Sequence, residues 1–569
     1  MCGFIGHIGI GQLGRIERAL PWITGRGPDS QRTWYSRDNV VGLLHARLAI
    51  VDSDPRAHQP LVDESAGVAV ALVGEIYNHR DLRRELSDYR FSTESDTEVV
   101  LASYVRDGVQ GLRRLKGMYA VVIVDERQRQ IVLARDPIGK KPLFIARWGN
   151  EVLFGSSLLA LVAVHAKPVT VDGSVAGHYW DEAFVPPART IIAGAIPVLP
   201  GYALVLDWSG ALKAAHDCEP DAVLAYSGES AATVQSNITL LLRTAVSRRL
   251  DHNPAPLSLL SGGIDSTVVT AMAREVLERD QGRSLGALTL GAFVPGTQDE
   301  FYARYAARRL GIPLKILRPR RHDLAAEIER ALDLQDEPLG MPSFFFLERM
   351  VAAAAEYGRI LLTGDGGDEV FYGYRVPGEW VNPRADVQSE PEIHVGGATP
   401  GWMSDWGRKV TTSTLLGHML AKADRASAEQ AVELRCPLLD WDLVRYVRSL
   451  PPQLMGQGGV SKALLKEQLA GWPRWFLERQ KLGFSYNLRW QWGVSRFAGL
   501  RERIEERALE TFADRLPPPL AGRALEWKTA DVLRNFSAVW RLLAWSRFLC
   551  RLDRATNAER ELRVRRAPA

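Results

Sequence analysis

The sequence has 569 residues, of which 46% are hydrophobic and 24% are charged, as is ordinary for a globular protein of two or more domains. The formal net charge of only +4 excludes a strong electrostatic attraction to nucleic acid or to a membrane surface. No apolar run reaches the roughly 20 residues of a membrane span, so we expect neither nucleic acid nor a membrane as a partner.

The first 210 residues read as short strands joined by tight turns. Apolar runs that suit strands buried on both faces occur at residues 3–8, 68–73, 120–124 and 131–134. We expect a layered sheet domain with few helices over residues 1–210, followed by a linker over residues 211–235.

From residue 236 onward the pattern changes to helices that alternate with strands. Helical periodicity occurs at residues 236–249, 267–278, 301–310 and 322–334, and strand-like runs occur at residues 257–260, 285–289 and 360–362. This alternation predicts a doubly wound parallel sheet in a domain over residues 236–550. We expect mostly helices after residue 410, a mobile loop at residues 382–406 and a polar tail at residues 551–569.

The cysteines lie far apart and show neither CxxC nor metal-ligand spacing: Cys2, Cys218, Cys436 and Cys550. We expect no signal peptide before them. We expect reduced thiols and a cytoplasmic location, because disulfides persist mainly in oxidising compartments.

The chain begins Met1-Cys2-Gly3, so removal of Met1 would leave a cysteine at the N-terminus. An α-amino group has a pKa of about 7.7–8.0 and can accept the thiol proton, which gives a nucleophile and its base on one residue. Taken by itself, Cys2 could equally be a small buried residue that starts the first strand.

A phosphate-binding loop is predicted at residues 261–266, Ser-Gly-Gly-Ile-Asp-Ser, between a strand and a helix. Glycines allow the backbone to approach an anion, and the N-terminus of a helix offers free N–H groups. Asp265 would repel phosphate unless it holds Mg²⁺. The alternative is an ordinary glycine-rich turn. The loop is not the Gly-Lys-Ser/Thr type that transfers a γ-phosphate; it is similar to the loop of the ATP pyrophosphatases.

With Cys2 at one end and this loop in the middle, the chain resembles the glutamine-dependent asparagine synthetase family over nearly its whole length. In the first half the resemblance rests on Arg26-Gly27-Pro28-Asp29, His45-Ala46-Arg47-Leu48-Ala49-Ile50, His58-Gln59-Pro60, Gly74-Glu75-Ile76-Tyr77-Asn78, Ser95-Asp96-Thr97-Glu98 and Ala134-Arg135-Asp136-Pro137. In the second half it rests on Thr363-Gly364-Asp365-Gly366-Gly367-Asp368-Glu369, Lys422-Ala423-Asp424-Arg425, Glu433-Leu434-Arg435-Cys436-Pro437, Ser461-Lys462 and Arg479-Gln480-Lys481-Leu482-Gly483-Phe484.

For the first half, the resemblance implies a class II glutamine amidotransferase domain with a four-layer α/β/β/α fold of the N-terminal-nucleophile type. In the family pattern Cys2 attacks the glutamine amide carbon, and the Gly74 N–H forms part of the oxyanion hole. The residues that would bind glutamine are Arg47, Leu48, Ile50, Glu75 and Asp96.

For the second half, the resemblance implies a synthetase domain of the ATP-pyrophosphatase type, and thus an α/β multidomain chain active in asparagine biosynthesis. ATP would be bound by Leu259, Ser261, Gly262, Gly263, Asp265, Ser266, Thr289, Gly364 and Asp365. Asp265 and Asp368 would hold Mg²⁺, Asp365 would serve as a catalytic acidic group, and Lys462 would stabilise charge when the nitrogen nucleophile attacks an acyl-adenylate.

Several residues depart from the family pattern. Val73 stands where the family has an asparagine that donates to the oxyanion, and loss of one such donor typically costs about 100- to 1000-fold in turnover. Smaller departures occur at Tyr372, at residues 336–346, which include three phenylalanines that more often form core than pocket, and at residues 426–428.

Three functions therefore stay open. The first is a ligase that converts aspartate to asparagine with ATP and glutamine, and the second is a tailoring ligase for another carboxylate with a weakened glutaminase. An uncleaved Met1 would favour the second. The third is a non-catalytic sensor, against which the presence of Asp265, Asp365, Asp368 and Lys462 argues. A homodimer is considered by family analogy only.

Overall fold

The computed structural model describes residues 1–9, 14–221, 223–250, 256–281, 283–291, 298–318, 324–371, 373, 415–451, 454, 461–479 and 536–557. Three features singled out in the sequence, Tyr372, the loop at residues 382–406 and residues 480–484, lie outside the described residues.

The first half contains two six-stranded antiparallel sheets. The first sheet has the order β10 (Ala195–Pro197), β8 (Phe144–Trp148), β9 (Glu151–Gly155), β1 (Gly3–Ile8), β3 (Val41–Arg47) and β2 (Ser30–Tyr35). The second has the order β12 (Leu212–Asp217), β11 (Tyr202–Asp207), β7 (Gln130–Arg135), β6 (Gly117–Asp125), β5 (Val68–Ile76) and β4 (Leu61–Asp63). Strand β12 therefore uses the first residues of the predicted linker.

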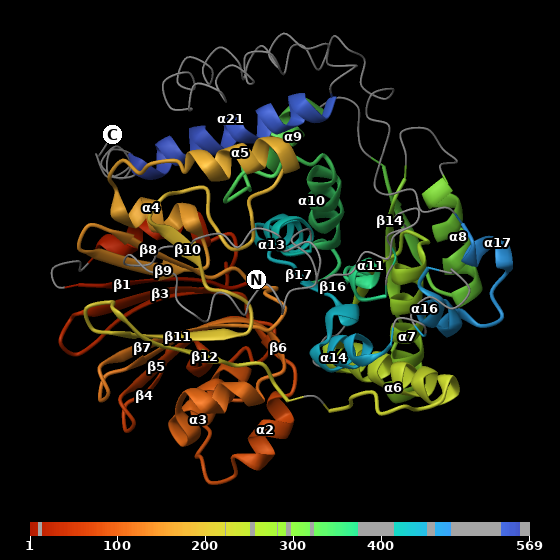
Figure 1. The fold of residues 1–569 in the computed structure, drawn as a ribbon, viewed down its shortest axis with the longest axis horizontal. Coiled ribbons are helices and arrows are strands. Elements are labelled where there is room, and N and C mark those ends of the chain that lie inside the picture. The colour runs from red at the N-terminus through yellow and green to blue at the C-terminus, as the bar shows by residue number, and fades with distance from the viewer. Residues whose placement is uncertain are drawn as a thin grey trace.

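Helices cover the outer face of each sheet (Figure 1). Helix α4 (Leu158–His165) lies over the first sheet with α5 (Gly173–Glu182) farther out on the same side, and α2 (His79–Glu85) and α3 (Asp96–Asp107) lie over the second. Alternate residues of β5 face opposite ways, as strand geometry requires: Val73 enters the core between the sheets, whereas Leu72 faces the helices. The predicted four-layer α/β/β/α arrangement is confirmed.

The second half is built on a five-stranded parallel sheet, as predicted. Its order is β15 (Leu314–Leu317), β14 (Gly286–Leu290), β13 (Leu257–Leu259), β16 (Ile360–Leu362) and β17 (Glu433–Arg435). The strand order reverses between β13 and β16, and ligands of such sheets bind outside the carboxyl ends of the strands at this point. Strand β17 lies in a segment that we expected to be mostly helical. Its three residues are too few to show the alternation of apolar and polar side chains that indicates a strand.

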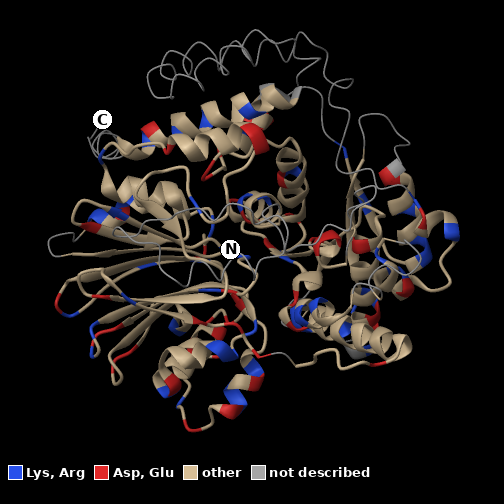
Figure 2. Cartoon of the chain, viewed as in Figure 1, with Lys and Arg blue, Asp and Glu red and all other residues tan. Residues whose placement is uncertain are grey.

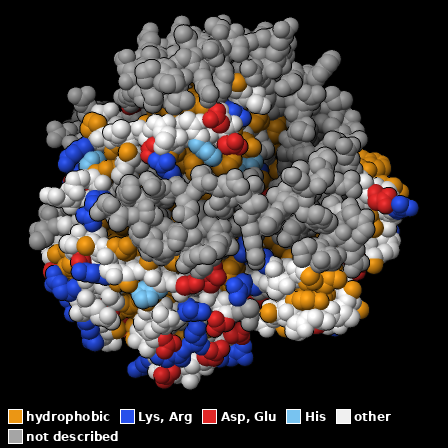
Figure 3. Space-filling view, viewed as in Figure 1, with side chains coloured by type: hydrophobic (Ala, Val, Ile, Leu, Met, Phe, Trp, Pro, Cys, Tyr) orange, Lys and Arg blue, Asp and Glu red, His pale blue; other side chains and the backbone are white. Residues whose placement is uncertain are grey.

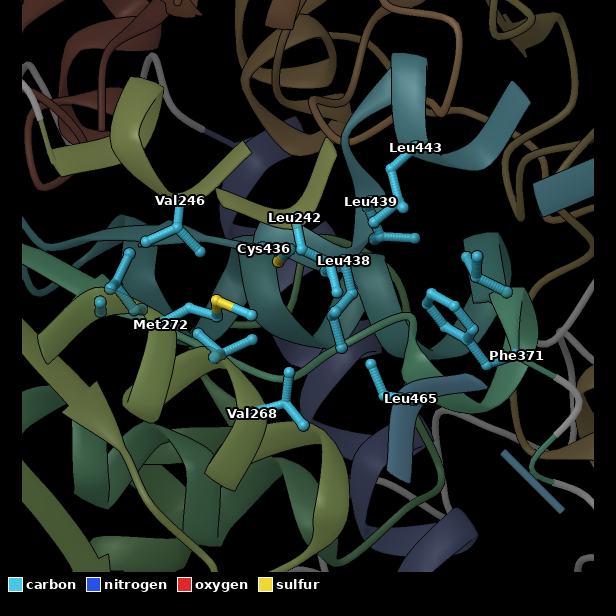
Figure 4. Close-up of a cluster of buried hydrophobic side chains, with 14 of the residues drawn as sticks. Leu242, Val246, Val268, Met272, Phe371, Cys436, Leu438, Leu439, Leu443 and Leu465 are labelled. Carbon is cyan, nitrogen blue, oxygen red and sulfur yellow. The ribbon is translucent and has the colours of Figure 1, made fainter. Parts of the chain in front are cut away.

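Helices pack on both faces of the parallel sheet. One face carries α6 (Ala231–Leu250), α7 (Ile264–Gln281), α8 (Gln298–Leu310), α14 (Trp441–Ser449) and α16 (Ala463–Lys466). Figure 4 shows the core beneath them, which includes Leu242 and Val246 of α6 together with Leu438 and Leu439. The other face carries α9 (Leu324–Leu332), α10 (Ser343–Ala354) and α13 (Ala421–Ala428). All three phenylalanines of α10 are buried in this second core, in agreement with the prediction that they form core rather than pocket.

The last described helix, α21 (Phe536–Thr556), returns to the first half of the chain and packs on α4 and α5 (Figure 1). Its Trp545 is fully buried and stacks on Tyr179 of α5 with a centroid separation of 5.4 Å. The same helix joins the second half through an ion pair between Arg547 and Asp333. It extends past residue 551, where the polar tail was expected to begin.

Charges of both signs lie side by side on the surface. Arginines and acidic residues lie close together on α2 and at the end of α3 (Figure 2), and the lower part of the face in Figure 3 carries both colours close together. Among the described residues, no helix combines the length and the apolar character that a membrane crossing requires.

Because Trp545 fills the contact between α21 and the first half, we expect Trp545→Ala to lower the free energy of unfolding by about 3–5 kcal/mol. Urea unfolding followed by circular dichroism measures this. The matched control is Ser537→Ala on the exposed side of the same helix. Equal stability of the two variants would contradict the packing role of α21.

Candidate active sites

The thiol of Cys2 lies at the start of β1, next to the end of β3. The Leu48 N–H donates to Cys2 Sγ at 3.3 Å, and the thiol lies 3.7 Å from the Leu48 carbonyl oxygen. The side chain is buried, and this burial raises the pKa of the thiol. A buried thiol of this kind needs a nearby base before it can act as a nucleophile.

The N-terminal amine lies in the same buried region. Met1 is almost completely buried, and burial lowers the pKa of its ammonium group to about 5. A terminal amine in this environment is neutral at pH 7 and can accept a proton. While Met1 is attached, the nitrogen of Cys2 is an amide and cannot do so.

Arg47 is the last residue of β3, and one nitrogen of its guanidinium group remains available for a hydrogen bond. Its Nη2 donates to the carbonyl oxygens of Val51 and Asp52 at 3.1 and 2.5 Å. Its Nη1 is buried and has no hydrogen-bond partner among the described residues. A buried guanidinium in this state is suited to a carboxylate, which it binds in a planar geometry.

Two buried carboxyl groups lie at the end of β5 and the start of α3. Asp96 Oδ2 accepts a hydrogen bond of 2.9 Å from the Ile76 N–H. Burial raises the pKa of Glu75, and the negative charges of Glu433 and Asp96 raise it further. Burial also raises the pKa of Asp96. A cation that entered between these groups would relieve their repulsion, as the ammonium group of an amino acid can do.

The backbone at Gly74 admits only glycine. Its φ is +121°, and a Cβ atom there would lie 1.8 Å from the Met118 carbonyl oxygen. The preceding Val73 is fully buried in the core between the sheets, in the same apolar cluster as Cys2, and the half-buried Ile50 packs against this cluster. Its side chain has no hydrogen-bond donor, so of the two predicted oxyanion donors only the Gly74 N–H could act.

The predicted phosphate loop connects β13 to the 18-residue helix α7. Gly262 has a φ of +72°, and a Cβ atom there would lie 2.5 Å from the backbone nitrogen of Ala303. Ser261 Oγ lies 3.0 Å from Ser266 Oγ and accepts from the Gly263 N–H at 3.3 Å. These contacts form a tight turn that opens onto the N-terminus of a long helix.

The loop after β16 lies against the phosphate loop. A Cβ atom at Gly364 would lie 2.6 Å from the Ser266 nitrogen, and one at Gly367 would lie 2.4 Å from Asp265 Oδ1. Thr363 Oγ1 donates to Asp365 Oδ2 at 2.8 Å. The strand-order reversal therefore brings together two loops that are about a hundred residues apart in the sequence, with the predicted residues Leu259 and Thr289 on the adjoining strands β13 and β14.

Lys462 connects the two loops. Its Nζ lies 2.5 Å from Asp265 Oδ2 and 2.6 Å from Asp368 Oδ1. Burial lowers the pKa of Lys462, but attraction to the two carboxylates outweighs it and the net shift is upward. Its backbone is left-handed, with φ +55°, at the start of α16.

The carboxylates of Asp265 and Asp368 also fit a magnesium ion, because they already share one cation, the Lys462 ammonium group. The described residues contain no cluster of three or more His, Cys, Asp or Glu suited to a metal. Two carboxylates suffice for Mg²⁺ when substrate phosphates supply further oxygen ligands.

A second set of residues joins the two halves beside Cys2. Arg26 Nε donates to the Cys2 carbonyl oxygen at 2.9 Å, and its guanidinium binds both carboxylate oxygens of Asp424 on α13 at 2.9 and 3.2 Å. Both side chains are buried. Both residues lie in motifs singled out in the sequence, but their pairing was not predicted, since they are 398 positions apart.

The segment at residues 336–346 begins at the interface between the halves. Asp336 accepts hydrogen bonds from backbone N–H groups at the start of α4, and Glu337 accepts from the Ile191 N–H at 2.9 Å and pairs with Arg425 at 3.1 Å. Asp336, Glu337 and Arg425 also line a cavity between the halves, together with Arg26.

The predicted residues thus form two groups. The first half brings together Cys2, Arg47, Leu48, Gly74, Glu75 and Asp96 around the N-terminus. The second half brings together the loops that carry Ser261, Asp265, Asp365, Asp368 and Lys462.

Comparisons with known proteins agree with this division. The family model of the glutamine amidotransferase domain matches residues 1–215, and that of asparagine synthase matches residues 237–547. The chain is 26% identical to glutamine-hydrolyzing asparagine synthetase 1 of Bacillus subtilis (strain 168), with 95% of each chain covered. It is 27% identical to asparagine synthetase B of Escherichia coli (strain K12), over 86% of this chain and 82% of that one.

Two further likenesses are more limited. The chain is 28% identical to amidase chry2 of Gibberella zeae, over 69% of this chain and 59% of the relative. The solved structure of glutamine phosphoribosylpyrophosphate amidotransferase from B. subtilis is 15% identical with a TM-score of 0.29, over 64% of this chain and 81% of that one.

Burial raises the pKa of the Glu337 carboxyl to about 7, against the attraction of Arg425. A carboxyl with a raised folded pKa destabilises the protein when it ionises. The contribution of Glu337 to the free energy of unfolding should therefore be most favourable below pH 4.5, its pKa in the unfolded chain, and should fall as the pH rises to 7. Over this range we expect the wild type to lose about 3 kcal/mol more than Glu337→Gln, which cannot ionise. Urea unfolding of both proteins across this pH range tests the sign, with Glu478→Gln, an exposed carboxyl, as control. Parallel pH profiles for wild type and Glu337→Gln would contradict it.

Proposed function

Because the chain belongs to the asparagine synthase family and carries a glutamine amidotransferase domain, we propose that it amidates a carboxylate with ATP, with glutamine as nitrogen donor and L-aspartate as acceptor. The observation that carries this proposal is that each of the two predicted sets of residues gathers at a buried place of its own, one in the first half and one in the second half of the chain. The long relatives in B. subtilis and E. coli, both named asparagine synthetases, support aspartate as the acceptor. The cytoplasmic location and the homodimer stay predictions.

The first site releases ammonia. With Met1 removed, the α-amino group of Cys2 takes the thiol proton, and Sγ attacks the glutamine amide carbon. Arg47 binds the α-carboxylate of glutamine through its available Nη1, and Glu75 and Asp96 bind the ammonium group. The Gly74 N–H donates to the oxyanion. Ammonia leaves, and water hydrolyses the thioester to glutamate.

The second site activates the acceptor. ATP phosphates lie on residues 261–266 at the N-terminus of α7, and the acceptor carboxylate attacks the α-phosphorus to give an acyl-adenylate and pyrophosphate. Asp265 and Asp368 would hold Mg²⁺, which neutralises charge on the phosphate oxygens. Ammonia then attacks the acyl carbon, and the amide and AMP are released.

Lys462 and Asp365 act on this last step. The Lys462 ammonium group, fixed between Asp265 and Asp368, stabilises the negative charge that develops on the acyl oxygen and the leaving phosphate. Asp365, held by the Thr363 hydroxyl, accepts the proton that the attacking nitrogen loses.

A second function is favoured by one specific observation. Val73 replaces the usual oxyanion donor with an apolar side chain, although the residues that bind glutamine are all in place. A tailoring ligase that takes ammonium or another amine, and a carboxylate larger than aspartate, would tolerate this change. The likeness to amidase chry2 supports this alternative.

The first experiment is a mass-spectrometric assay with ATP, Mg²⁺, L-aspartate and amide-¹⁵N glutamine, run beside a reaction with ammonium. We expect ¹⁵N-asparagine, AMP and pyrophosphate from glutamine, together with loss of Met1 in the intact mass. Asparagine from ammonium alone would indicate an asparagine synthetase with an impaired glutaminase. No asparagine from either donor would refute aspartate as the acceptor.

The steric limit at Gly74 gives a second prediction. We expect Gly74→Ala to reduce glutamine-dependent turnover by about 100-fold or more, because the Met118 carbonyl group must move and displace the oxyanion donor. Ammonium-dependent amide synthesis should continue, and comparison of the two rates measures the effect.

Gly67→Ala is the matched control. Gly67 also has a positive φ, +70°, but a Cβ atom there would meet only the flexible Arg127 side chain, at 3.3 Å. Equal glutamine-dependent rates in the two variants would contradict the role of Gly74.

A further inference from the structure

Strand β17 lies between the two candidate sites. It forms the edge of the parallel sheet beside β16, and Figure 1 shows it as the strand of that sheet nearest the N-terminus. Its last residue, Arg435, is almost completely buried. The described contacts of this residue reach both sites, one through its side chain and the other through its backbone.

The Arg435 side chain belongs to the glutamine pocket. Its Nη2 lies 3.6 Å from Glu75 Oε2, and its Nε lies 2.7 Å from Glu433 Oε1. Its Nη1 donates to the Arg249 carbonyl oxygen at 2.7 Å. The contact with Glu75 is thus an ion pair without a close hydrogen bond, whereas the other two contacts are short. A small displacement would therefore weaken the Glu75 contact first.

The Arg435 backbone belongs to the adenylation site. Its carbonyl oxygen accepts a hydrogen bond of 3.0 Å from the Thr363 N–H, at the start of the loop that carries Asp365. The thiol of the next residue, Cys436, lies 3.3 Å from Thr363 Oγ1, which itself donates to Asp365 Oδ2. Movement of this loop would therefore be transmitted directly to Arg435.

We propose that Arg435 is a positioning residue that couples the two sites, so that nucleotide bound on the loop at residues 363–367 increases the affinity of the pocket for glutamine. This inference rests on the proposed function, because it assumes glutamine and ATP as the two ligands. It goes beyond that function by assigning a role to Arg435 and by stating that nucleotide strengthens glutamine binding.

The direction follows from the charges around Glu75. Without nucleotide, the guanidinium of Arg435 partly neutralises Glu75 and competes with the ammonium group of glutamine. When the loop closes on a nucleotide, the Thr363 hydrogen bond moves Arg435 with it and loosens the 3.6 Å contact. Glu75 then becomes available to the ammonium group. A coupling of this kind is reciprocal, so glutamine must increase nucleotide affinity by the same factor.

The test is calorimetric titration of glutamine into the full-length chain, with Cys2→Ala to prevent turnover. Each protein is titrated with and without magnesium α,β-methylene-ATP. We expect the nucleotide to tighten glutamine binding by about 5- to 150-fold when Arg435 is present. With Arg435→Lys, which keeps the charge but loses the guanidinium geometry, the nucleotide effect should fall below about 2-fold.

Two further variants make the test specific. Arg425→Lys alters another buried arginine pair, with Glu337, and should keep the full coupling. Glu433→Gln removes the short partner of Arg435 and strengthens its attraction to Glu75, so it should weaken glutamine binding without nucleotide and enlarge the coupling. If Arg435→Lys does not fold, Glu433→Gln still tests the inference.

The outcomes separate the two levels of the proposal. No glutamine binding by any protein would refute glutamine as the donor, and so the proposed function. Glutamine binding that nucleotide does not change, or changes equally with arginine and lysine at position 435, would refute only the coupling role. Loss of coupling in Arg425→Lys as well would also refute a specific role for Arg435.

Discussion

The buried ion pair between Arg26 and Asp424 fixes how the two halves of the chain meet. It brings α13 of the synthetase half to the carbonyl group of Cys2, at the first strand of the amidotransferase half. To leave one member of such a pair buried without its partner costs about 3–5 kcal/mol, so the two halves are strongly held in this orientation. The contacts of Asp336 with α4 and of Arg435 with Glu75 depend on the same orientation.

The reversal of strand order in the parallel sheet has a second consequence besides the nucleotide site. It places β17 at an edge, and an exposed edge strand offers unpaired backbone groups to other chains. Here Glu433 and Arg435 of this edge are buried close to the amidotransferase half. This edge strand is therefore covered, and it lies between the two candidate sites.

Val73 bears on turnover rather than on substrate binding in the proposed glutamine site. The groups suited to the charged ends of glutamine, Arg47 and Glu75, lie on strands whose positions the two sheets determine. The predicted oxyanion donors are instead one side chain and one backbone N–H, and with valine at position 73 only the Gly74 N–H could serve. A chain with these features can bind glutamine well and still hydrolyse it slowly, which is why the nitrogen donor and the acceptor are best measured separately.

The sequence by itself predicted a layered sheet domain, a doubly wound domain and the motifs through which a family resemblance implied the four-layer fold and the two candidate sets of site residues. Local patterns are sufficient for this, because strand runs such as residues 68–73, the loop at residues 261–266 and the motif around Asp365 each carry their signal within a few neighbours. Only the tertiary structure decided that Arg26 binds Asp424, that Lys462 bridges Asp265 and Asp368, and that Arg435 reaches Glu75. These contacts join residues that are about one hundred to four hundred positions apart, and no local periodicity encodes such long-range packing.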